Sequence, residues 1–191
     1  MPTAKLKNAI RQYSQIALLY PQQINLNSLG GTRPTLLRFD VQKQTQSQWC
    51  WAATAASISK YYNPTSRWTQ CLVATNVLNK NSCCISPITC NIPWYLNHAL
   101  SITDNFISIH SALTFNEVEL ELINSRVVGA RVEWIGGGGH FMVIYGCKTV
   151  NGINYYNIDD PIYGKSEIAE INFLTAYQGA GSWTHSYITK S

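Results

Sequence analysis

The hydrophobic pattern of this chain changes near residue 104, from a helical spacing before that point to an alternating one after it. An alanine-rich segment from Trp49 to Tyr62 contains neither glycine nor proline and is followed by Asn63-Pro64, so the sequence predicts a helix there. Two shorter helices are predicted over Thr69 to Leu78 and over Pro93 to Leu100, the second with its proline in the first turn.

Signals for strands dominate the second half of the chain. Ile107, Ile109 and Ser111 alternate, which places them on one face of a strand. Thr114-Phe115-Asn116-Glu117 matches a capping box that opens a helix, and Asn151-Gly152 suits a two-residue hairpin turn. Further strands are predicted over four ranges: Val127 to Trp134, His140 to Thr149, Ile153 to Ile158, and Trp183 to Thr189.

Because the helices precede the strands, the sequence predicts an α+β domain of two segregated lobes. The helical lobe is expected over about residues 45–103 and the β lobe over about residues 104–191. Residues 1–35 are polar and mixed and contain several breakers, so we predict a leader or pro-segment ahead of a main domain at residues 36–191.

The composition limits the classes of protein that the chain can belong to. Apolar residues make up 46% of it and charged residues 13%, which is typical of a globular protein. The net charge of +4 comes from scattered basic residues, which argues against a nucleic-acid partner. The apolar runs are too short to cross a membrane, and no N-terminal stretch has the cleavage pattern of a signal peptide. We expect a monomer.

Four of the six cysteines, Cys71, Cys83, Cys84 and Cys90, lie close together in the sequence. They can close into two disulfides, for which three connectivities remain open. A zinc site is the alternative, but zinc ligands usually come as spaced pairs of cysteines, and the adjacent Cys83-Cys84 fits that pattern poorly. We therefore predict disulfides and no metal, which implies an oxidising compartment and a secreted protein.

Cys50 is a candidate nucleophile because it lies in the first turn of the predicted helix. Unpaired N–H groups and the positive end of the helix dipole favour a thiolate at such a position. Trp49 and Trp51 flank it with bulky aromatic rings, where a structural cysteine would need only small neighbours. A cysteine at a helix start is nevertheless most often part of the core, so this feature alone does not identify a catalytic site.

A nucleophilic cysteine needs a base, and the chain has four histidines. His140 follows four consecutive glycines and opens an apolar strand, so its ring is expected at a strand end where a substrate chain can approach closely. The glycine run could also be a simple hairpin loop; a phosphate loop is excluded because no Gly-Lys-Ser/Thr follows. His98, His110 and His185 are interpreted as structural or solvated.

The base in turn needs a group that orients it, and Asp159 and Asp160 are the candidates. The Asn151-Gly152 turn folds their strand back against the strand of His140. Neighbouring residues of a strand point to opposite faces, so only one of the two carboxylates can reach the histidine. Carboxylates before a proline, here Pro161, also commonly just initiate a turn.

These residues together resemble a known family. The segment Gln44-Thr45-Gln46-Ser47-Gln48-Trp49-Cys50-Trp51-Ala52-Ala53 resembles the active-site segment of papain-like cysteine peptidases, and the Gly-His140 strand resembles their histidine strand. The resemblance implies a papain-like fold with the active site in a cleft between the two lobes. It also implies an oxyanion hole formed by the Gln44 side chain and the backbone N–H of Cys50.

The likeness is closer to bacterial peptidases of the avirulence-protein type, which share Trp-Cys-Trp-Ala-Ala, a Gly-Gly-His strand, an Asp-Pro and a double-cysteine loop. It covers about residues 40–190 and implies that Asp160, directly before Pro161, is the third catalytic residue. The chain departs from plant papain in two ways. Ser47 stands where papain has a disulfide-bonded cysteine, and the third catalytic residue is an aspartate instead of an asparagine.

The resemblance implies a secreted cysteine endopeptidase, a bacterial effector or toxin, that acts on a protein or peptide without any cofactor. Cys50, His140 and Asp160 would hydrolyse the peptide bond through a thioester acyl-enzyme. Two alternatives stay open. One is a transglutaminase-like or deamidating toxin that uses the same three residues, and the other is an inactive binding module stapled by disulfides.

Overall fold

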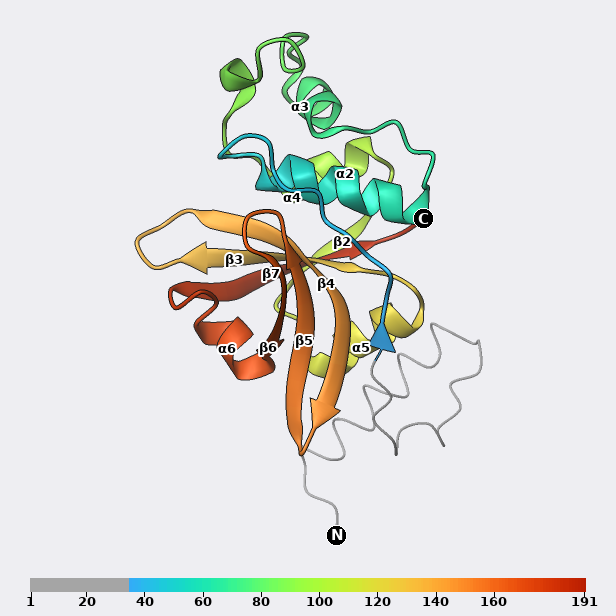
Figure 1. Ribbon diagram of the computed structural model, residues 1–191, viewed down its shortest axis with the longest axis vertical. Helices are drawn as coiled ribbons and strands as arrows, with labels where there is room; N and C mark the ends of the chain where they lie inside the picture. The colour runs from blue at the N-terminus through green and yellow to red at the C-terminus, as the bar shows by residue number, and fades with distance from the viewer. Residues whose placement is uncertain (1–34) are drawn as a thin grey trace. The chain divides into compact units, whose positions relative to one another are not determined.

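The computed structural model describes residues 35–191, which fall within one compact unit. The predicted leader over residues 1–35 lies, apart from Thr35, outside the described residues. Among the described residues, the predicted order of helices and strands is confirmed as an α+β fold (Figure 1). The elements are β1 (Thr35–Leu36), α2 (Cys50–Tyr62), α3 (Gln70–Leu78), η2 (Pro87–Cys90), α4 (Leu96–Ile102), β2 (Phe106–Ser111), α5 (Phe115–Ile123), β3 (Val128–Trp134), β4 (Gly139–Val150), β5 (Ile153–Asp160), β6 (Gly164–Ala169), α6 (Glu170–Thr175) and β7 (Gly181–Thr189).

The strands form one antiparallel sheet in the order β2-β7-β3-β4-β5-β6, and β1 adds a short pairing to β4. Figure 1 shows α2, α3 and α4 gathered on one side of this sheet, while α5 and α6 lie beside its strands, away from these three helices. None of the helices in residues 35–191 has the length and apolar character that crossing a membrane requires.

Strand β4 lies between two hydrophobic cores and contributes to both. Phe141, Val143 and Tyr145 pack with α2 and α4 on one face, whereas Met142 and Ile144 pack with α5 and α6 on the other. This is the alternation that a strand buried on both faces requires. His140, near the start of β4, is therefore carried on the most enclosed strand of the sheet.

A β-bulge interrupts the pairing of β4 with β5. From Val150 to Gly146 the register follows the hairpin turn, with Gly146 opposite Asn157, but Ile144 then lies opposite Ile158. Two residues of β4, Tyr145 and Gly146, thus oppose one residue of β5. Beyond the bulge, each residue of β5 therefore shares a face of the sheet with the other set of alternating β4 residues than it would in an uninterrupted hairpin.

One prediction about a single element was wrong, and two elements were not anticipated. Pro93 does not lie in the first turn of a helix, because α4 begins only at Leu96. The backbone before Pro93 is used differently, since the carbonyl of Ile92 accepts a hydrogen bond from the indole of Trp51 (3.1 Å). Strand β6 and helix α6 were not anticipated, because their short sequence has no clear period.

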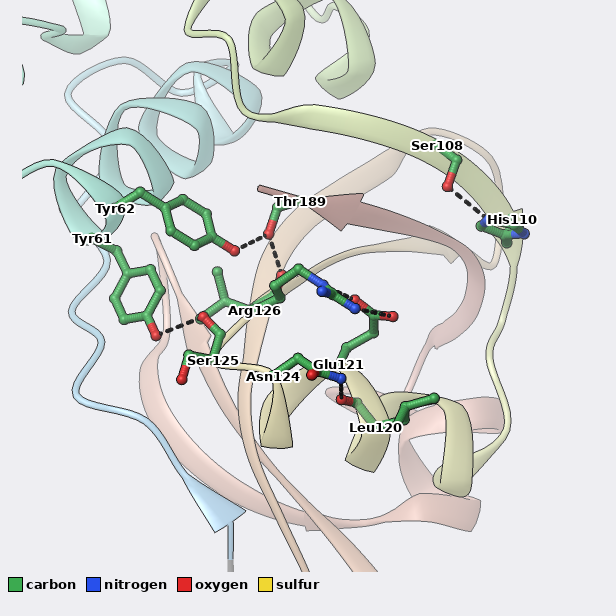
Figure 2. A network of polar contacts seen from close by, with 11 residues as sticks. Tyr61, Tyr62, Ser108, His110, Leu120, Glu121, Asn124, Ser125, Arg126 and Thr189 are labelled. Carbon is green, nitrogen blue, oxygen red and sulfur yellow. Dashed lines mark hydrogen bonds and ion pairs between the residues drawn. The ribbon is translucent and has the colours of Figure 1, made fainter. Parts of the chain in front are cut away.

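The C-terminal end of α2 is fastened to the β lobe by polar contacts (Figure 2). The hydroxyl of Tyr61 donates to the carbonyl oxygen of Ser125 (3.0 Å), and the hydroxyl of Tyr62 lies 2.6 Å from Oγ1 of Thr189. These contacts join a helix to a loop and a strand far along the chain. The helix that begins at Cys50 is thereby fixed against the sheet that carries His140.

The two predicted disulfides are present, which excludes the zinc alternative for these four cysteines. Cys71 is bonded to Cys84 and Cys83 to Cys90. The first disulfide links the loop between α3 and α4 to the start of α3, and the second closes that loop on itself. No group of three or more side chains suited to bind a metal occurs among residues 35–191.

Candidate active site

Cys50 is the first residue of α2, and its side chain is buried, with 8% of the residue exposed. The first backbone hydrogen bond of the helix runs from Ala53 to the carbonyl of Trp49 (2.9 Å), so the N–H groups before Ala53 have no partner within the helix. The first turn has no side-chain cap and contains no acidic residue. The positive end of the helix dipole therefore acts on the sulfur without competition from a carboxylate.

His140 lies near the start of β4, with only 3% of the residue exposed. Its Nε2 is 2.8 Å from Oδ1 of Asp160, and the side chain of Cys50 lies close enough to raise the pKa of its ring. Because Nε2 is engaged by Asp160, the other ring nitrogen, Nδ1, is left for the sulfur. The fold thus brings together a cysteine and a histidine that are 90 positions apart in the sequence.

The surroundings of His140 favour its protonated form. Burial by itself lowers the pKa of the imidazole, but the hydrogen bonds and negative charges of Asp160 and Cys50 outweigh it and raise the pKa to about 9. The imidazole is thus held as a cation between two groups that can carry negative charge. Such a cation is a proton donor at neutral pH.

Asp160 is the last residue of β5, and both of its carboxylate oxygens are occupied. Oδ1 accepts from the backbone N–H groups of Ile162 (2.7 Å) and Tyr163 (3.0 Å) in addition to His140, and Oδ2 accepts from the hydroxyl of Tyr177 (2.7 Å). Burial raises the pKa of this carboxyl, but the interactions with His140 and the two N–H groups lower it below its ordinary value overall. Asp160 is therefore an ionised carboxylate that is fixed in one orientation.

Asp159 points to the opposite face of β5 and does not hydrogen-bond to His140. Its Oδ2 accepts from the backbone N–H of Val41 (2.8 Å) and lies 4.0 Å from Nζ of Lys165. Burial raises its pKa. The bulge in β4 makes the difference, because it pairs Val143 with Asp159 and so turns Asp160 to the face that His140 shares.

Aromatic rings surround the Cys50, His140 and Asp160 cluster. Trp134 is stacked on the His140 ring at a centroid distance of 6.1 Å and on Tyr177 at 6.3 Å, and Tyr163 meets the His140 ring edge-on at 6.2 Å. Trp183 packs against Phe173 at 5.0 Å in the core of the β lobe.

The four glycines form the hairpin between β3 and β4. Gly136, Gly137 and Gly138 all have positive φ angles, between 84° and 100°, a conformation that side chains disfavour. A Cβ added to any of the three would meet no atom within 4 Å. The run is therefore needed for the backbone of the turn, and it leaves open space beside the start of β4, next to His140.

Gln44 lies six residues before Cys50 and is half buried. Its Nε2 donates to the carbonyl oxygens of Gln46 and Ser47, at 2.9 Å each, while its Oε1 is buried without a hydrogen-bond partner. The backbone N–H of Gln44 donates to the carbonyl of Pro161 (2.9 Å), which ties this loop to the end of β5. Both hydrogens of the carboxamide are directed at the backbone, so one of them must be shared to reach a substrate oxyanion.

The other three histidines and the second free cysteine make different contacts. His98 packs beside Trp94, His110 lies 2.8 Å from the hydroxyl of Ser108 (Figure 2), and His185 lies 2.9 Å from the hydroxyl of Thr184. Cys147 is buried in the β lobe, and burial raises the pKa of its thiol to about 12. Cys147 is therefore a neutral thiol at physiological pH.

A cavity of about 430 Å³ lies away from this cluster, at the C-terminal end of α2. Its walls include Ser59, Tyr62, Arg67, Trp68 and Asn105, but none of the site residues predicted from the sequence. The cluster of Cys50 and His140 lies at the opposite end of α2, where the helix meets the starts and ends of the strands.

Sequence reasoning did not identify Tyr177 or Asn91. Tyr177 lies between α6 and β7, where no pattern in the sequence indicates a neighbour for Asp160. Asn91 follows the last disulfide cysteine and hydrogen-bonds to the turn before Cys50. The position beside Cys90 was the only available signal for it.

Two comparisons with known proteins found matches to this chain. The family described as papain-like cysteine protease AvrRpt2 matches residues 35–178. A similar solved structure comes from a study of limited antibody cross-reactivity between the mite allergens Blo t 1 and Der p 1. That chain has a TM-score of 0.53 and 12% sequence identity, over 88% of this chain and 74% of its own length, which shows a shared fold. Among curated protein sequences, none matches this chain.

Proposed function

The chain belongs to the family of AvrRpt2-like papain-like cysteine proteases and is thus a cysteine peptidase, and we propose that Cys50, His140 and Asp160 form its catalytic triad. The observation that carries the proposal is the buried imidazole of His140, which hydrogen-bonds to Asp160 and whose pKa is raised by both Asp160 and Cys50. A nucleophile, a base and an orienting acid in this order are the parts that acyl transfer through a cysteine requires.

In the proposed reaction the thiolate of Cys50 attacks the carbonyl carbon of a peptide bond and forms a tetrahedral oxyanion. His140 then gives its proton to the leaving amine, the C–N bond breaks, and a thioester remains on the sulfur. A water molecule attacks the thioester while His140 takes one of its protons. The C–S bond breaks, which releases the acid product and restores the thiolate.

The supporting groups have separate functions in this reaction. The carboxylate of Asp160 keeps Nε2 of His140 protonated and the ring in one orientation, so that Nδ1 faces the sulfur. The backbone N–H of Cys50, which has no partner within the helix, is one donor for the oxyanion, and the Gln44 carboxamide is the second. Trp134 covers the His140 ring and limits the access of water to it.

The substrate of a peptidase is a protein or peptide, and we propose that this enzyme cleaves within the chain of its substrate. Two disulfides in the described residues support an oxidising compartment. We therefore extend the proposal to a secreted enzyme, either extracellular or delivered as an effector.

The test compares wild type with Cys50→Ala, and uses Cys147→Ala as the matched control because Cys147 is the other free cysteine. We expect wild type and Cys147→Ala to cleave a peptide library and to react with an epoxide inhibitor at one site, and Cys50→Ala to do neither. Product masses separate hydrolysis from the alternatives, since cleavage splits the peptide, whereas deamidation adds about one dalton. Unmodified Cys50 in a folded, inactive wild type would support a binding module instead.

A further inference from the structure

Three consecutive residues, Cys90 to Ile92, hydrogen-bond to the segment from Ser47 to Trp51, which contains the proposed nucleophile. The carbonyl of Cys90 accepts from the indole of Trp49 (2.7 Å), and the carbonyl of Ile92 accepts from the indole of Trp51 (3.1 Å). The two tryptophans that flank Cys50 are thus both bound to the same short stretch of backbone. This gives a structural reason for the bulky neighbours of Cys50.

Asn91, between these two acceptors, holds the turn before the helix through its side chain. Its Oδ1 accepts from the backbone N–H of Gln48 (2.8 Å), and its Nδ2 donates to Oγ of Ser47 (2.9 Å). One carboxamide therefore fixes two consecutive residues of the turn. Since the helix has no side-chain cap of its own, the contacts of Asn91 restrain this turn from outside the helix.

The position of Asn91 is itself set by the disulfide Cys83–Cys90. Both sulfurs of this pair are fully buried in the core that also contains Trp49 and Trp51, whereas Cys84 of the other pair, Cys71–Cys84, is exposed. The buried disulfide ends directly before Asn91 in the sequence. It therefore restrains the backbone that carries the carboxamide.

The restrained turn carries the groups that the proposed function assigns to the oxyanion. The carboxamide of Gln44 is held by the carbonyls of Gln46 and Ser47, and the backbone N–H of Cys50 follows the turn two residues after Gln48. A shift of the turn would move both oxyanion donors together. A misplacement of about 1 Å at such a site can lower the rate about 10²-fold.

We propose that Asn91, held by the Cys83–Cys90 disulfide, is a positioning residue that keeps the oxyanion donors aligned with the substrate carbonyl. The proposal rests on the proposed function of Cys50 as the nucleophile. Asn91 acts through Ser47 and Gln48 and makes no contact with the reacting atoms. The disulfide loop thereby serves the chemistry as well as the stability of the fold.

The first test replaces the side chain of Asn91. For Asn91→Ala we expect kcat on a peptide substrate to fall about 10- to 100-fold with KM changed less than about twofold. Asn91→Asp keeps an acceptor for the Gln48 N–H and can accept from the Ser47 hydroxyl, so it should recover most of kcat. The matched control is Asn81→Ala in the same loop, because Asn81 is exposed and its side chain makes no hydrogen bond within the described residues.

A second measurement separates positioning from general damage. Alkylation of Cys50 by iodoacetamide requires the thiolate but forms no oxyanion, so its rate in Asn91→Ala should stay within about threefold of wild type. Parallel losses of kcat and of the alkylation rate would overturn the proposal in favour of a purely structural function. If Asn91→Ala does not fold, Asn91→Gln, which displaces the carboxamide by one methylene group, takes its place with the same expectation.

Variants that lack one disulfide provide an independent test of the proposal. Cys83→Ser with Cys90→Ser should lower kcat in the same way as Asn91→Ala, while Cys71→Ser with Cys84→Ser should affect kcat less than threefold. An unchanged kcat in Asn91→Ala, with Cys50→Ala inactive, would refute this inference and leave the triad standing. Activity in Cys50→Ala would refute the proposed function itself.

Discussion

Replacement of Asp160 by asparagine removes one charge from the proposed triad and leaves its hydrogen bonds in place. The amide oxygen can still accept from His140, Ile162 and Tyr163, and the new NH₂ group can donate to the hydroxyl of Tyr177, which rotates to accept. A unit charge about 4 Å from the imidazolium is worth about 4 kcal/mol at an effective dielectric constant near 20, or about three pKa units. We therefore expect the pKa of His140 to fall from about 9 to roughly 6 in Asp160→Asn.

This shift has a kinetic readout. The proposed mechanism needs His140 as a proton donor, so the alkaline limb of kcat/KM in wild type should lie near pH 9 and move to roughly pH 6 in Asp160→Asn. The matched control is Asp159→Asn, because Asp159 is equally buried but faces Val41 and Lys165. Its profile should follow wild type. An alkaline limb that does not move in Asp160→Asn would contradict the function given to Asp160.

The same charge has a thermodynamic readout. The pKa of His140 in the folded protein, about 9, lies above the ordinary value of 6.5, so the resulting stabilisation is complete below pH 6.5 and is lost as the pH rises through about 9. A difference of that size corresponds to about 3 kcal/mol of unfolding free energy. Urea denaturation at pH 6 and pH 9.5 should show this decline in wild type and Asp159→Asn. A decline of the same size in Asp160→Asn would refute the reasoning.

Two further changes test the neighbourhood of the site and the fold. Tyr177→Phe keeps the stacking on Trp134 but removes one hydrogen-bond donor from Asp160, so the carboxylate becomes more basic. The alkaline limb of the pH–rate profile should therefore move up by a few tenths of a pH unit. A downward shift would contradict this. Thr114→Ala removes the N-cap of α5 and should lower the unfolding free energy, measured by urea titration, by about 1 kcal/mol without an effect on kcat. An unchanged unfolding free energy would show that the capping box is dispensable.

The sequence predicted much of the fold because its local signals agree with the tertiary structure. The alanine-rich helix, the capping box at Thr114 and the Asn151-Gly152 turn are all present, and both turn residues have the positive φ angles that such a turn needs. Strand β6 and helix α6 could not be anticipated, because they are short and take their conformation from the strands and core beside them.

The choice between Asp159 and Asp160 shows where local signals end. A regular hairpin from the Asn151-Gly152 turn would pair Ile144 with Asp159 and so place Asp159 on the face of His140. The bulge at Tyr145 and Gly146 reverses this, and Asp160 takes that face. A Cβ at Gly146 would lie 2.6 Å from the side chain of Leu36, so the glycine allows β1 to pair closely with β4. No pattern in the sequence indicates the extra residue of the bulge.

The double burial of β4 has a consequence for how the enzyme can move. Phe141 and Met142 are adjacent, yet they belong to different cores, so the helical lobe cannot swing away from the sheet without uncovering one side of a strand whose other side is still packed. Hinge motion between the lobes is therefore costly. We therefore expect adaptation to a substrate to come from parts outside the shared strand, such as the glycine hairpin and the turn after Asp160, while the packing of β4 holds the imidazole in place.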